Sequence, residues 1–218
     1  MSADSSNTAE LIIFDLDGTL VDSRRDIAAS INEGLSRVAG ITRPEEEIFP
    51  LIGRPLDHMY EVLLPEGETA RAPEASAVYR EHFFHNCDVH SRVFPGVFEC
   101  LEKLGDKRLA IATTKATFQA VRVSDVMGLS GFFELVHGSD EIPHKPDPAV
   151  VLQVLERLDV PPGRAWMVGD TILDVGAGRA AGLRTCAVTY GIGAREDLER
   201  ADPDLVVDSI DELPGRIF

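Results

Sequence analysis

The strongest chemical signal in the sequence is a pair of aspartates, Asp15 and Asp17, which follows the apolar run Leu11–Phe14 and precedes Gly18. Residues two apart in an extended strand share a face, where two carboxylates repel each other unless a cation lies between them. Gly18 lets the backbone turn sharply and approach a ligand closely. Acidic turns are common after strands, but the whole string Asp-Leu-Asp-Gly-Thr-Leu after four apolar residues favours a binding or catalytic site.

Other polar residues stand where later apolar runs end or where prolines interrupt the chain. These candidates are Thr113 and Thr114 after one apolar run, Lys145 in the string His-Lys-Pro-Asp-Pro, and Asp170 and Asp174 in the string Gly-Asp-Thr-Ile-Leu-Asp. Each has an ordinary structural explanation when taken alone, such as a solvated loop charge or an acidic residue at a helix N-terminus. Their occurrence together with the first string makes them candidates for a shared site.

Short apolar runs alternate with amphipathic stretches along most of the chain. Runs of about four apolar residues suit strands that are buried on both faces of a parallel sheet. Strands that alternate with helices indicate a doubly wound α/β sheet. We expect strands at 11–14, 109–112, 133–136, 165–168, 185–188 and 204–207. We expect helical faces at Phe118, Val121 and Val126, at Val150, Val154, Leu155 and Leu158, and at Ile172, Val175 and Ala180.

One long interval, residues 22–94, contains helical signals and no good strand. Its apolar residues recur at helical spacing. They are Ile27, Ile31, Leu35 and Val38 in one stretch, and Tyr79, Phe83 and Phe84 in another. We therefore predict a helical cap domain over 22–94, an α/β core domain over 11–21 and 95–218, and a flexible tail over 1–10.

Composition limits the partners that this chain can have. Its 218 residues include 37 acidic and 21 basic side chains, giving a net charge of -16, which disfavours binding to nucleic acid or to an anionic membrane. No segment has the ~18 consecutive apolar residues of a membrane span, and the N-terminus lacks the pattern of a signal peptide. Three widely spaced cysteines form no disulfide or zinc pattern. We expect a cytoplasmic monomer or homodimer that acts on a small molecule.

The string that begins at Asp15 resembles the first motif of the haloacid dehalogenase-like hydrolase superfamily. The settings of Thr113, Lys145 and Asp170 resemble its later motifs, in the same order, although the residues after Thr113 match less strictly. The resemblance covers residues 11 to about 213 and is greatest for phosphoglycolate phosphatases. It implies an α/β core with a small α-helical cap inserted directly after the first motif.

The resemblance also implies chemical roles for these residues. Asp15 is expected to attack phosphorus and form an aspartyl-phosphate, while Asp17 serves as the general acid and base. Mg²⁺, which prefers hard oxygen ligands, is expected to bind Asp15, the backbone carbonyl of Asp17 and Asp170. Lys145 is expected to neutralise the nucleophile and the phosphate. Asp174 is expected to orient either the metal ligands or Lys145.

Substrate contacts are expected from both parts of the chain. Thr113, Thr114 and the backbone at Gly18 can donate hydrogen bonds to phosphate oxygens. Arg54 lies in the loop-like string Leu-Ile-Gly-Arg-Pro-Leu of the cap, which is similar to the specificity loop of the superfamily. Its guanidinium could bind a substrate carboxylate or second phosphate, or it could pair with acidic residues of the cap.

The predicted function is a Mg²⁺-dependent phosphatase that hydrolyses a small, phosphoglycolate-like phosphomonoester. Asp17 favours a phosphate ester over a halide, because an ester oxygen needs a proton on departure and a halide does not. The absence of lysine between Asp15 and Lys103 disfavours phosphonate hydrolysis, which uses a cap lysine in related enzymes. The alternatives are a sugar-phosphate mutase of the β-phosphoglucomutase type, a nucleotide or sugar-phosphate phosphatase, and a phosphate-responsive binding or scaffold protein with a slow site.

Overall fold

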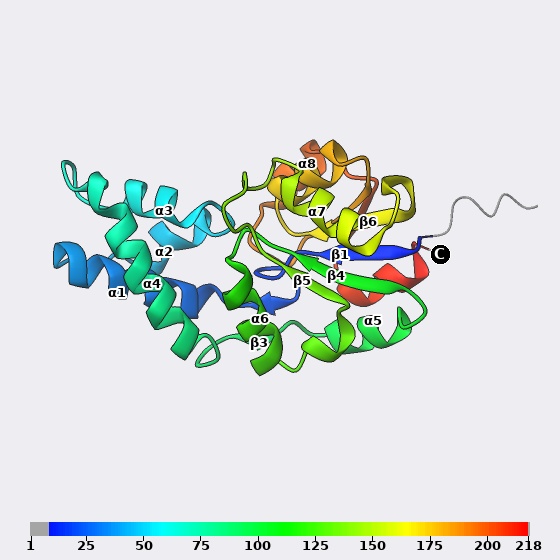
Figure 1. Ribbon diagram of the computed structural model, residues 1–218, viewed down its shortest axis with the longest axis horizontal. Coiled ribbons are helices and arrows are strands. Elements are labelled where there is room, and N and C mark those ends of the chain that lie inside the picture. Colours follow the sequence, from blue (N-terminus) through cyan, green and yellow to red (C-terminus); the bar gives the residue numbers. More distant parts are fainter. Residues whose placement is uncertain (1–8, 218) are drawn as a thin grey trace, which may run out of the picture.

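A computed structural model of the chain describes residues 9–217 and contains a central parallel sheet (Figure 1). The strands are β1 (Leu11–Phe14), β4 (Arg108–Ala112), β5 (Leu135–His137), β6 (Ala165–Gly169), β7 (Arg184–Val188) and β8 (Leu205–Val207). They lie in the order β5-β4-β1-β6-β7-β8, and every neighbouring pair is parallel. The predicted doubly wound α/β fold is confirmed, with each expected strand in place to within two residues.

Helices cover both faces of this sheet. They are α5 (Val97–Lys103), α6 (Thr117–Val126), α7 (Ala149–Leu158), α8 (Ile172–Ala180) and α9 (Arg195–Arg200). Side chains alternate along β1, so that Leu11 and Ile13 join the apolar cluster of α7 and α8, while Ile12 and Phe14 join that of α5 and α6. This alternation explains why every residue of β1 is buried. Short 3-10 helices complete the chain: η1 (Phe49–Leu51), η2 (Thr69–Arg71), η3 (Ser130–Phe132), η4 (Pro162–Arg164) and η5 (Ile210–Gly215).

The buried faces of two core helices differ from those expected. The face predicted for α7 is buried throughout, but Phe118 and Val121 of α6 are 48% and 39% exposed, and Ile172 of α8 is 50% exposed. Phe118 and Ile172 stand at the first turns of their helices, past the carboxyl ends of the strands, where the sheet no longer covers them. Phe118 instead contacts Phe84 of the cap, with ring centroids 5.9 Å apart.

A block of helices lies beside one end of the sheet, between β1 and β4 of the sequence (Figure 1). The block contains α1 (Arg24–Ala39), α2 (Glu45–Ile48), α3 (Leu56–Leu63) and α4 (Ala72–Asn86). The predicted apolar face of α1 is buried. Gly34 allows α1 to meet α3 closely, because a Cβ at this position would lie 2.2 Å from Tyr60 Oη. The inserted helical cap predicted from the sequence is therefore present.

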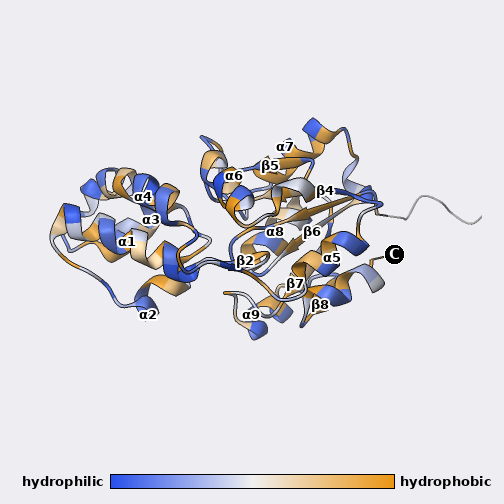
Figure 2. Cartoon of the chain, turned by 90° about the horizontal axis from the view of Figure 1, so that it is seen from below, coloured by the Kyte–Doolittle hydropathy of each residue, from blue (hydrophilic) through white to orange (hydrophobic). Residues whose placement is uncertain are grey.

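An antiparallel ribbon joins the cap to the core. Its strands are β2 (Val21–Asp22) and β3 (Arg92–Val93). The predicted cap boundaries, 22 and 94, fall in or next to this ribbon, and we keep them as a proposal. Figure 2 shows hydrophobic residues along the strands of the core, whereas hydrophilic residues mark the outer turns of the cap helices.

The tail predicted over 1–10 is wrong at its last two residues. Residues 1–8 lie outside the described residues, whereas Ala9 is buried and Glu10 is tied to the core. The backbone N–H of Glu10 donates to the carbonyl of Arg164 at 2.8 Å, and the Glu10 carboxylate lies 2.9 Å from the Arg164 guanidinium. These contacts continue the pairing between β1 and β6, which places both residues in the folded core.

Two further observations concern the cysteines and the apolar character of the helices. The three cysteines, Cys87, Cys100 and Cys186, are all buried and free. Among the helices described between residues 9 and 217, none combines the length and apolar character needed to cross a membrane.

Candidate active site

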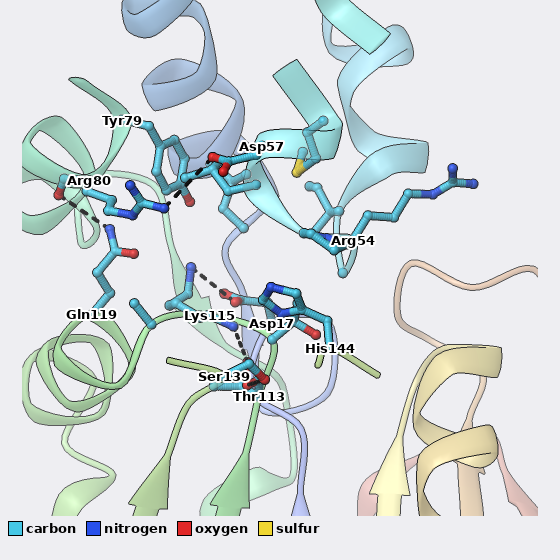
Figure 3. Close-up of a pocket in the computed structure, with 18 of the residues that line it drawn as sticks. Asp17, Arg54, Asp57, Tyr79, Arg80, Thr113, Lys115, Gln119, Ser139 and His144 are labelled. Carbon is cyan, nitrogen blue, oxygen red and sulfur yellow. Dashed lines mark hydrogen bonds and ion pairs between the residues drawn. The ribbon is translucent and has the colours of Figure 1, made fainter. Parts of the chain in front are cut away.

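A cavity of about 440 Å³ lies between the cap and the carboxyl ends of the core strands (Figure 3). Asp15 follows β1, Thr113 follows β4 and Asp170 follows β6, so three strand ends deliver polar side chains to one edge of the sheet. These strands are neighbours in the sheet order, β4-β1-β6. Asp15 and Thr113 line the cavity directly, while Asp170 lies buried beside Asp15.

Lys145 connects the candidate residues. Its Nζ donates hydrogen bonds to Asp15 Oδ1 at 2.8 Å, Asp174 Oδ1 at 2.5 Å and the carbonyl of Ala112 at 3.0 Å. The side chain is 2% exposed, so these partners replace water around the ammonium group. The structure thus places Lys145 against Asp15, the predicted nucleophile.

Asp174 makes contacts on both sides of its carboxylate. Oδ1 accepts from Lys145, and Oδ2 accepts from the backbone N–H and the hydroxyl of Thr171, at 3.0 and 2.6 Å. The contacts with Thr171 form a capping box at the start of α8. Asp174 therefore caps the start of α8 and holds Lys145 at the same time. Both interpretations from the sequence, an acidic residue at a helix N-terminus and an orienting group for Lys145, describe its contacts.

Asp170 is fully buried behind the first string. Its Oδ1 accepts from the Thr19 hydroxyl and its Oδ2 from the backbone N–H of Ile192, both at 2.8 Å. Gly18 has φ +92, and a Cβ there would lie 2.2 Å from Asp170 Oδ2. The predicted close approach at Gly18 is therefore an approach to this carboxylate, and only glycine fits it.

The buried carboxylates suit a divalent cation. Within the described part of the chain, oxygens of Asp15, Asp170 and Asp174 all lie within 4.8 Å of one another. Three carboxylates beside the single ammonium of Lys145 leave an excess of negative charge in a site with little water. A small cation with oxygen ligands would balance this charge, and the donor set is the one that Mg²⁺ prefers. The residues present therefore fit Mg²⁺. Asp174 lies beside the two predicted carboxylate ligands, Asp15 and Asp170.

Electrostatics at these residues show the same imbalance. Burial raises the pKa of Asp15 to about 6, although the charge of Lys145 opposes this shift. Burial also raises the pKa of Asp170 well above its usual value, with further contributions from Asp174 and Asp15. Burial by itself lowers the pKa of Lys145, but the charges of Asp15 and Asp174 outweigh it and raise the pKa overall. Lys145 therefore stays charged, while the carboxylates lack sufficient positive charge around them.

Asp17 is held by two partners at the mouth of the site. Oδ1 accepts from the Ser23 hydroxyl at 2.5 Å, and Oδ2 lies 3.1 Å from the Lys115 ammonium. The Lys115 side chain is 6% exposed, and its ammonium lies 3.9 Å from the centroid of the Phe83 ring. These contacts fix the carboxylate of Asp17 next to the cavity. Its backbone carbonyl as a metal ligand stays a prediction.

Lys115 was not among the site residues expected from the sequence. The available signal was its position two residues after Thr113, in the part of that motif where the resemblance is weaker. Thr113 itself is buried, and its Oγ1 accepts from the backbone N–H of Lys115 at 3.3 Å. Thr114 lines the same cavity, as expected for a substrate contact. His144, which was not among the site residues expected from the sequence, also lines it.

Arg54 departs from the expectation for a substrate contact. It belongs to the cavity wall, but Figure 3 shows its guanidinium directed away from the cavity. The nearest described partner is His58 Nε2 at 3.5 Å, one helical turn further along α3. Arg54 is exposed and precedes α3, which begins at Leu56. The structure therefore places Arg54 in the wall of the same cavity as Asp15, Asp17 and Thr113, with its guanidinium directed outwards, and its contact with the substrate stays a prediction.

Comparison with known families agrees with this geometry. Residues 12–188 match the family model described as haloacid dehalogenase-like hydrolase. The chain belongs to the haloacid dehalogenase-like hydrolase family. The matched range includes every catalytic, metal-binding and substrate-binding residue predicted above. The prediction that the chain is an enzyme of the hydrolase class is thereby confirmed.

Relatives with assigned names include several phosphatases of this family. The protein named "Probable phosphatase IndB" from Dickeya dadantii is 34% identical, over 94% of this chain and 92% of its own length. A phosphoglycolate phosphatase from Aquifex aeolicus is 33% identical, over 83% and 85% of the two chains. Pyrophosphatase PpaX from Bacillus velezensis is 32% identical, over 93% of each chain.

Solved structures of the family share the whole fold. The haloacid dehalogenase-like protein SP0104 from Streptococcus pneumoniae superposes with a TM-score of 0.87 at 29% identity, covering 96% of this chain and 99% of its own. This agreement extends over core and cap together. It supports both the parallel sheet and the helical insertion of this haloacid dehalogenase-like hydrolase.

Proposed function

We propose that this hydrolase is a Mg²⁺-dependent phosphatase that cleaves a small phosphomonoester through an aspartyl-phosphate on Asp15. The observation that carries the proposal is the contact between Asp15 and Lys145, 2.8 Å apart in a buried cluster with excess negative charge. A carboxylate nucleophile beside a fixed ammonium group, with a place for a cation, suits attack on an anionic phosphate. The names of the relatives, which include phosphoglycolate phosphatase and pyrophosphatase, support an enzyme of phosphoric ester chemistry.

The proposed first step transfers the phosphoryl group to the protein. An oxygen of Asp15 attacks phosphorus, the bond between phosphorus and the ester oxygen breaks, and that oxygen takes a proton from Asp17. The alcohol leaves and Asp15 carries the phosphate. Lys145 holds Asp15 in place and balances its charge, while Thr113 lies in the wall where it can donate to a phosphate oxygen.

The second step returns the phosphoryl group to water. Asp17, now a carboxylate, accepts a proton from a water molecule as the water oxygen attacks phosphorus. The bond between phosphorus and the Asp15 oxygen breaks, which releases inorganic phosphate and restores the nucleophile. Ser23 and Lys115 hold the Asp17 carboxylate at the cavity wall for both proton transfers. When bound, Mg²⁺ would screen the negative charges of phosphate and aspartates, held by Asp15 and Asp170 with Asp174 nearby.

The proposed chemistry is compatible with several small leaving groups. The named relatives differ in the substrate that their names give, which is the ester phosphoglycolate in one case and the anhydride pyrophosphate in another. Phosphoglycolate, the substrate favoured by the sequence resemblance, therefore belongs in a panel with other small phosphate esters. Product analysis of the same panel separates hydrolysis from the mutase alternative, because a mutase returns phosphate to the sugar rather than releasing it.

Turnover of p-nitrophenyl phosphate tests the proposal directly. We expect phosphate release with Mg²⁺, none after chelation by EDTA, and none from Asp15→Asn. Asp147→Asn is a matched control, because Asp147 is an exposed aspartate two residues after Lys145 and asparagine keeps its hydrogen bond with the N–H of Ala149. Equal turnover by the wild type and Asp15→Asn would overturn the proposed nucleophile, and no turnover with any ester would favour a binding protein.

A further inference from the structure

The cap side of the cavity contains a tyrosine whose hydroxyl has no assigned partner. Tyr79 of α4 is 5% exposed, and its ring stacks on Phe83 with centroids 5.4 Å apart and planes 11° from parallel. Figure 3 shows its hydroxyl directed into the cavity, towards the loops that carry Asp17 and Lys115. The hydroxyl makes no hydrogen bond to any residue in the described range 9–217.

The Tyr79 hydroxyl lines the cavity and makes no hydrogen bond within the described residues, so a group that enters the cavity can bind it. The other tyrosine of the cap, Tyr60, is fully buried and already has a protein partner. Its hydroxyl donates to the carbonyl of Ile31 at 3.2 Å, inside the helical bundle and away from the cavity. The Tyr79 hydroxyl differs because it faces a space that is large enough for a ligand, so a ligand is its natural partner.

The hydroxyl of Tyr79 is a neutral group at the working pH. Burial raises its pKa well above the usual value, and the charge of Asp17 adds to that shift. Tyr79 and Asp17, the proposed acid and base, line the same cavity. Tyr79 can therefore donate a hydrogen bond to a leaving group and accept one from it.

Charges in the cavity wall favour an uncharged leaving group. Lys115 lies 3.1 Å from Asp17, and Arg80 lies 4.0 Å from Asp57 on the cap side. The remaining arginine of the described wall, Arg54, is directed away from the cavity. Each of the first two cations thus already faces a carboxylate. A leaving group with its own carboxylate would have to compete with a protein carboxylate for either cation, whereas hydroxyl groups can bind without breaking these pairs.

The volume of the cavity also favours a leaving group larger than a two-carbon acid. Its size of about 440 Å³ falls within the range of ~300–1,000 Å³ typical of pockets that enclose drug-sized ligands. A two-carbon acid phosphate would fill a small part of this space. Asp57, Arg80 and the carbonyl-bound Gln119 add further polar groups along the cap and core walls, which suits an alcohol with several hydroxyls.

We propose that Tyr79 is a specificity-determining residue whose hydroxyl binds a leaving group bearing hydroxyl groups, so that the substrate class is a sugar phosphate rather than a carboxylic acid phosphate. This inference rests on the proposed phosphatase function. Tyr79 touches the leaving group and takes no part in the bond changes at phosphorus. Its contact should therefore matter for substrates with a hydroxyl within reach and be dispensable for the others.

The test compares Tyr79→Phe with the wild type on ribose 5-phosphate, glucose 6-phosphate, 2-phosphoglycolate and p-nitrophenyl phosphate. Phenylalanine keeps the ring that stacks on Phe83 and removes only the hydroxyl. We expect the wild type to prefer a sugar phosphate over 2-phosphoglycolate. Loss of one hydrogen bond should lower kcat/KM for that sugar phosphate about tenfold, while p-nitrophenyl phosphate stays within about twofold of the wild type.

Tyr60→Phe is the matched control, because it removes another buried cap hydroxyl that does not line the cavity. It should leave the ratio between sugar phosphate and p-nitrophenyl phosphate unchanged, even where the melting temperature falls. Equal losses on both substrates in Tyr79→Phe, or a wild-type preference for 2-phosphoglycolate, would overturn the inference. Failure of the wild type to cleave even p-nitrophenyl phosphate would instead overturn the proposed function, so the two failures are distinguishable.

Discussion

Addition of Mg²⁺ to the metal-free protein tests the carboxylate cluster without any turnover. Asp15 and Asp174 share the ammonium group of Lys145, and Asp170 lies beside them without a cation of its own in the described residues, so a bound divalent cation should stabilise the folded state. A ligand at about 100 times its dissociation constant adds about 2.7 kcal/mol to the free energy of unfolding if it binds only the folded protein. For a chain of this size, that stabilisation raises Tm by about 5–10 °C, which scanning calorimetry measures.

The size of this shift should depend on pH, because Asp15 must lose its proton to bind a cation. Burial raises the pKa of Asp15 to about 6, so a proton competes with the metal at pH 5 and hardly at pH 7. One such group makes the dissociation constant about tenfold larger at pH 5, which removes about 1.4 kcal/mol of the stabilisation. The raised pKa of Asp170 acts in the same direction.

Without the metal, the pH dependence has the opposite sign. The pKa of Asp15 is higher in the folded state than its ordinary value of 3.8, so the folded state binds this proton more tightly. The free energy of unfolding of the apoprotein should therefore fall as the pH rises from about 4 to about 6. Asp170→Asn should raise apoprotein stability by removing a buried charge, and should abolish the response to Mg²⁺.

Asp147→Asn again serves as the control and should respond to Mg²⁺ as the wild type does. Two results would refute the assignment of the cluster as the metal site. One is a Mg²⁺ shift of unchanged size in Asp170→Asn. The other is a wild-type shift that is the same at pH 5 and pH 7.

Substitutions at three further residues test individual contacts. Gly18→Ala places a Cβ 2.2 Å from Asp170 Oδ2, so we expect loss of Mg²⁺ binding by calorimetric titration, and undiminished affinity would contradict the close packing. Arg54→Ala should change kcat/KM on every ester by less than about twofold, because the guanidinium is directed away from the cavity. A loss of about 2 kcal/mol of transition-state stabilisation on one anionic substrate alone would contradict this and show that the guanidinium turns inward. Lys115→Met should lower kcat with little change in the melting temperature, because Asp17 loses an ion pair, whereas Lys115→Arg should restore part of the rate.

Much of the core could be predicted because its signals are local. Short apolar runs such as Leu11–Phe14 are typical of strands buried on both faces, and a strand end fixes where the next residues point. Asp15, Thr113 and Asp170 each follow a strand directly, so their meeting at one sheet edge follows from the fold class. The same reasoning located the cap, because helical spacing filled the interval between two strands.

Other features depend on contacts that no local pattern encodes. The partner of Lys115, Asp17, lies 98 positions earlier in the chain, and the guanidinium of Arg54 is directed away from the cavity. Phe118 has apolar spacing within α6, yet it faces the cap instead of the sheet. The ring of Tyr79 is buried, as its helical spacing indicated, but only the arrangement of cap and core shows that its hydroxyl faces a cavity.

The central claim is that Asp15 carries the phosphoryl group and Asp17 moves the protons. Asp17→Asn mixed with p-nitrophenyl phosphate tests it, since an aryl leaving group departs without a proton but hydrolysis of the intermediate needs the base. General-base assistance contributes ~10²- to 10⁴-fold, so we predict a burst of nitrophenolate near one equivalent, followed by a stall. Intact-protein mass spectrometry after rapid acid quench should show one phosphate on this variant and none on Asp15→Asn. An Asp17→Asn protein that turns over an alkyl phosphate at the wild-type rate, with no adduct, would contradict the account.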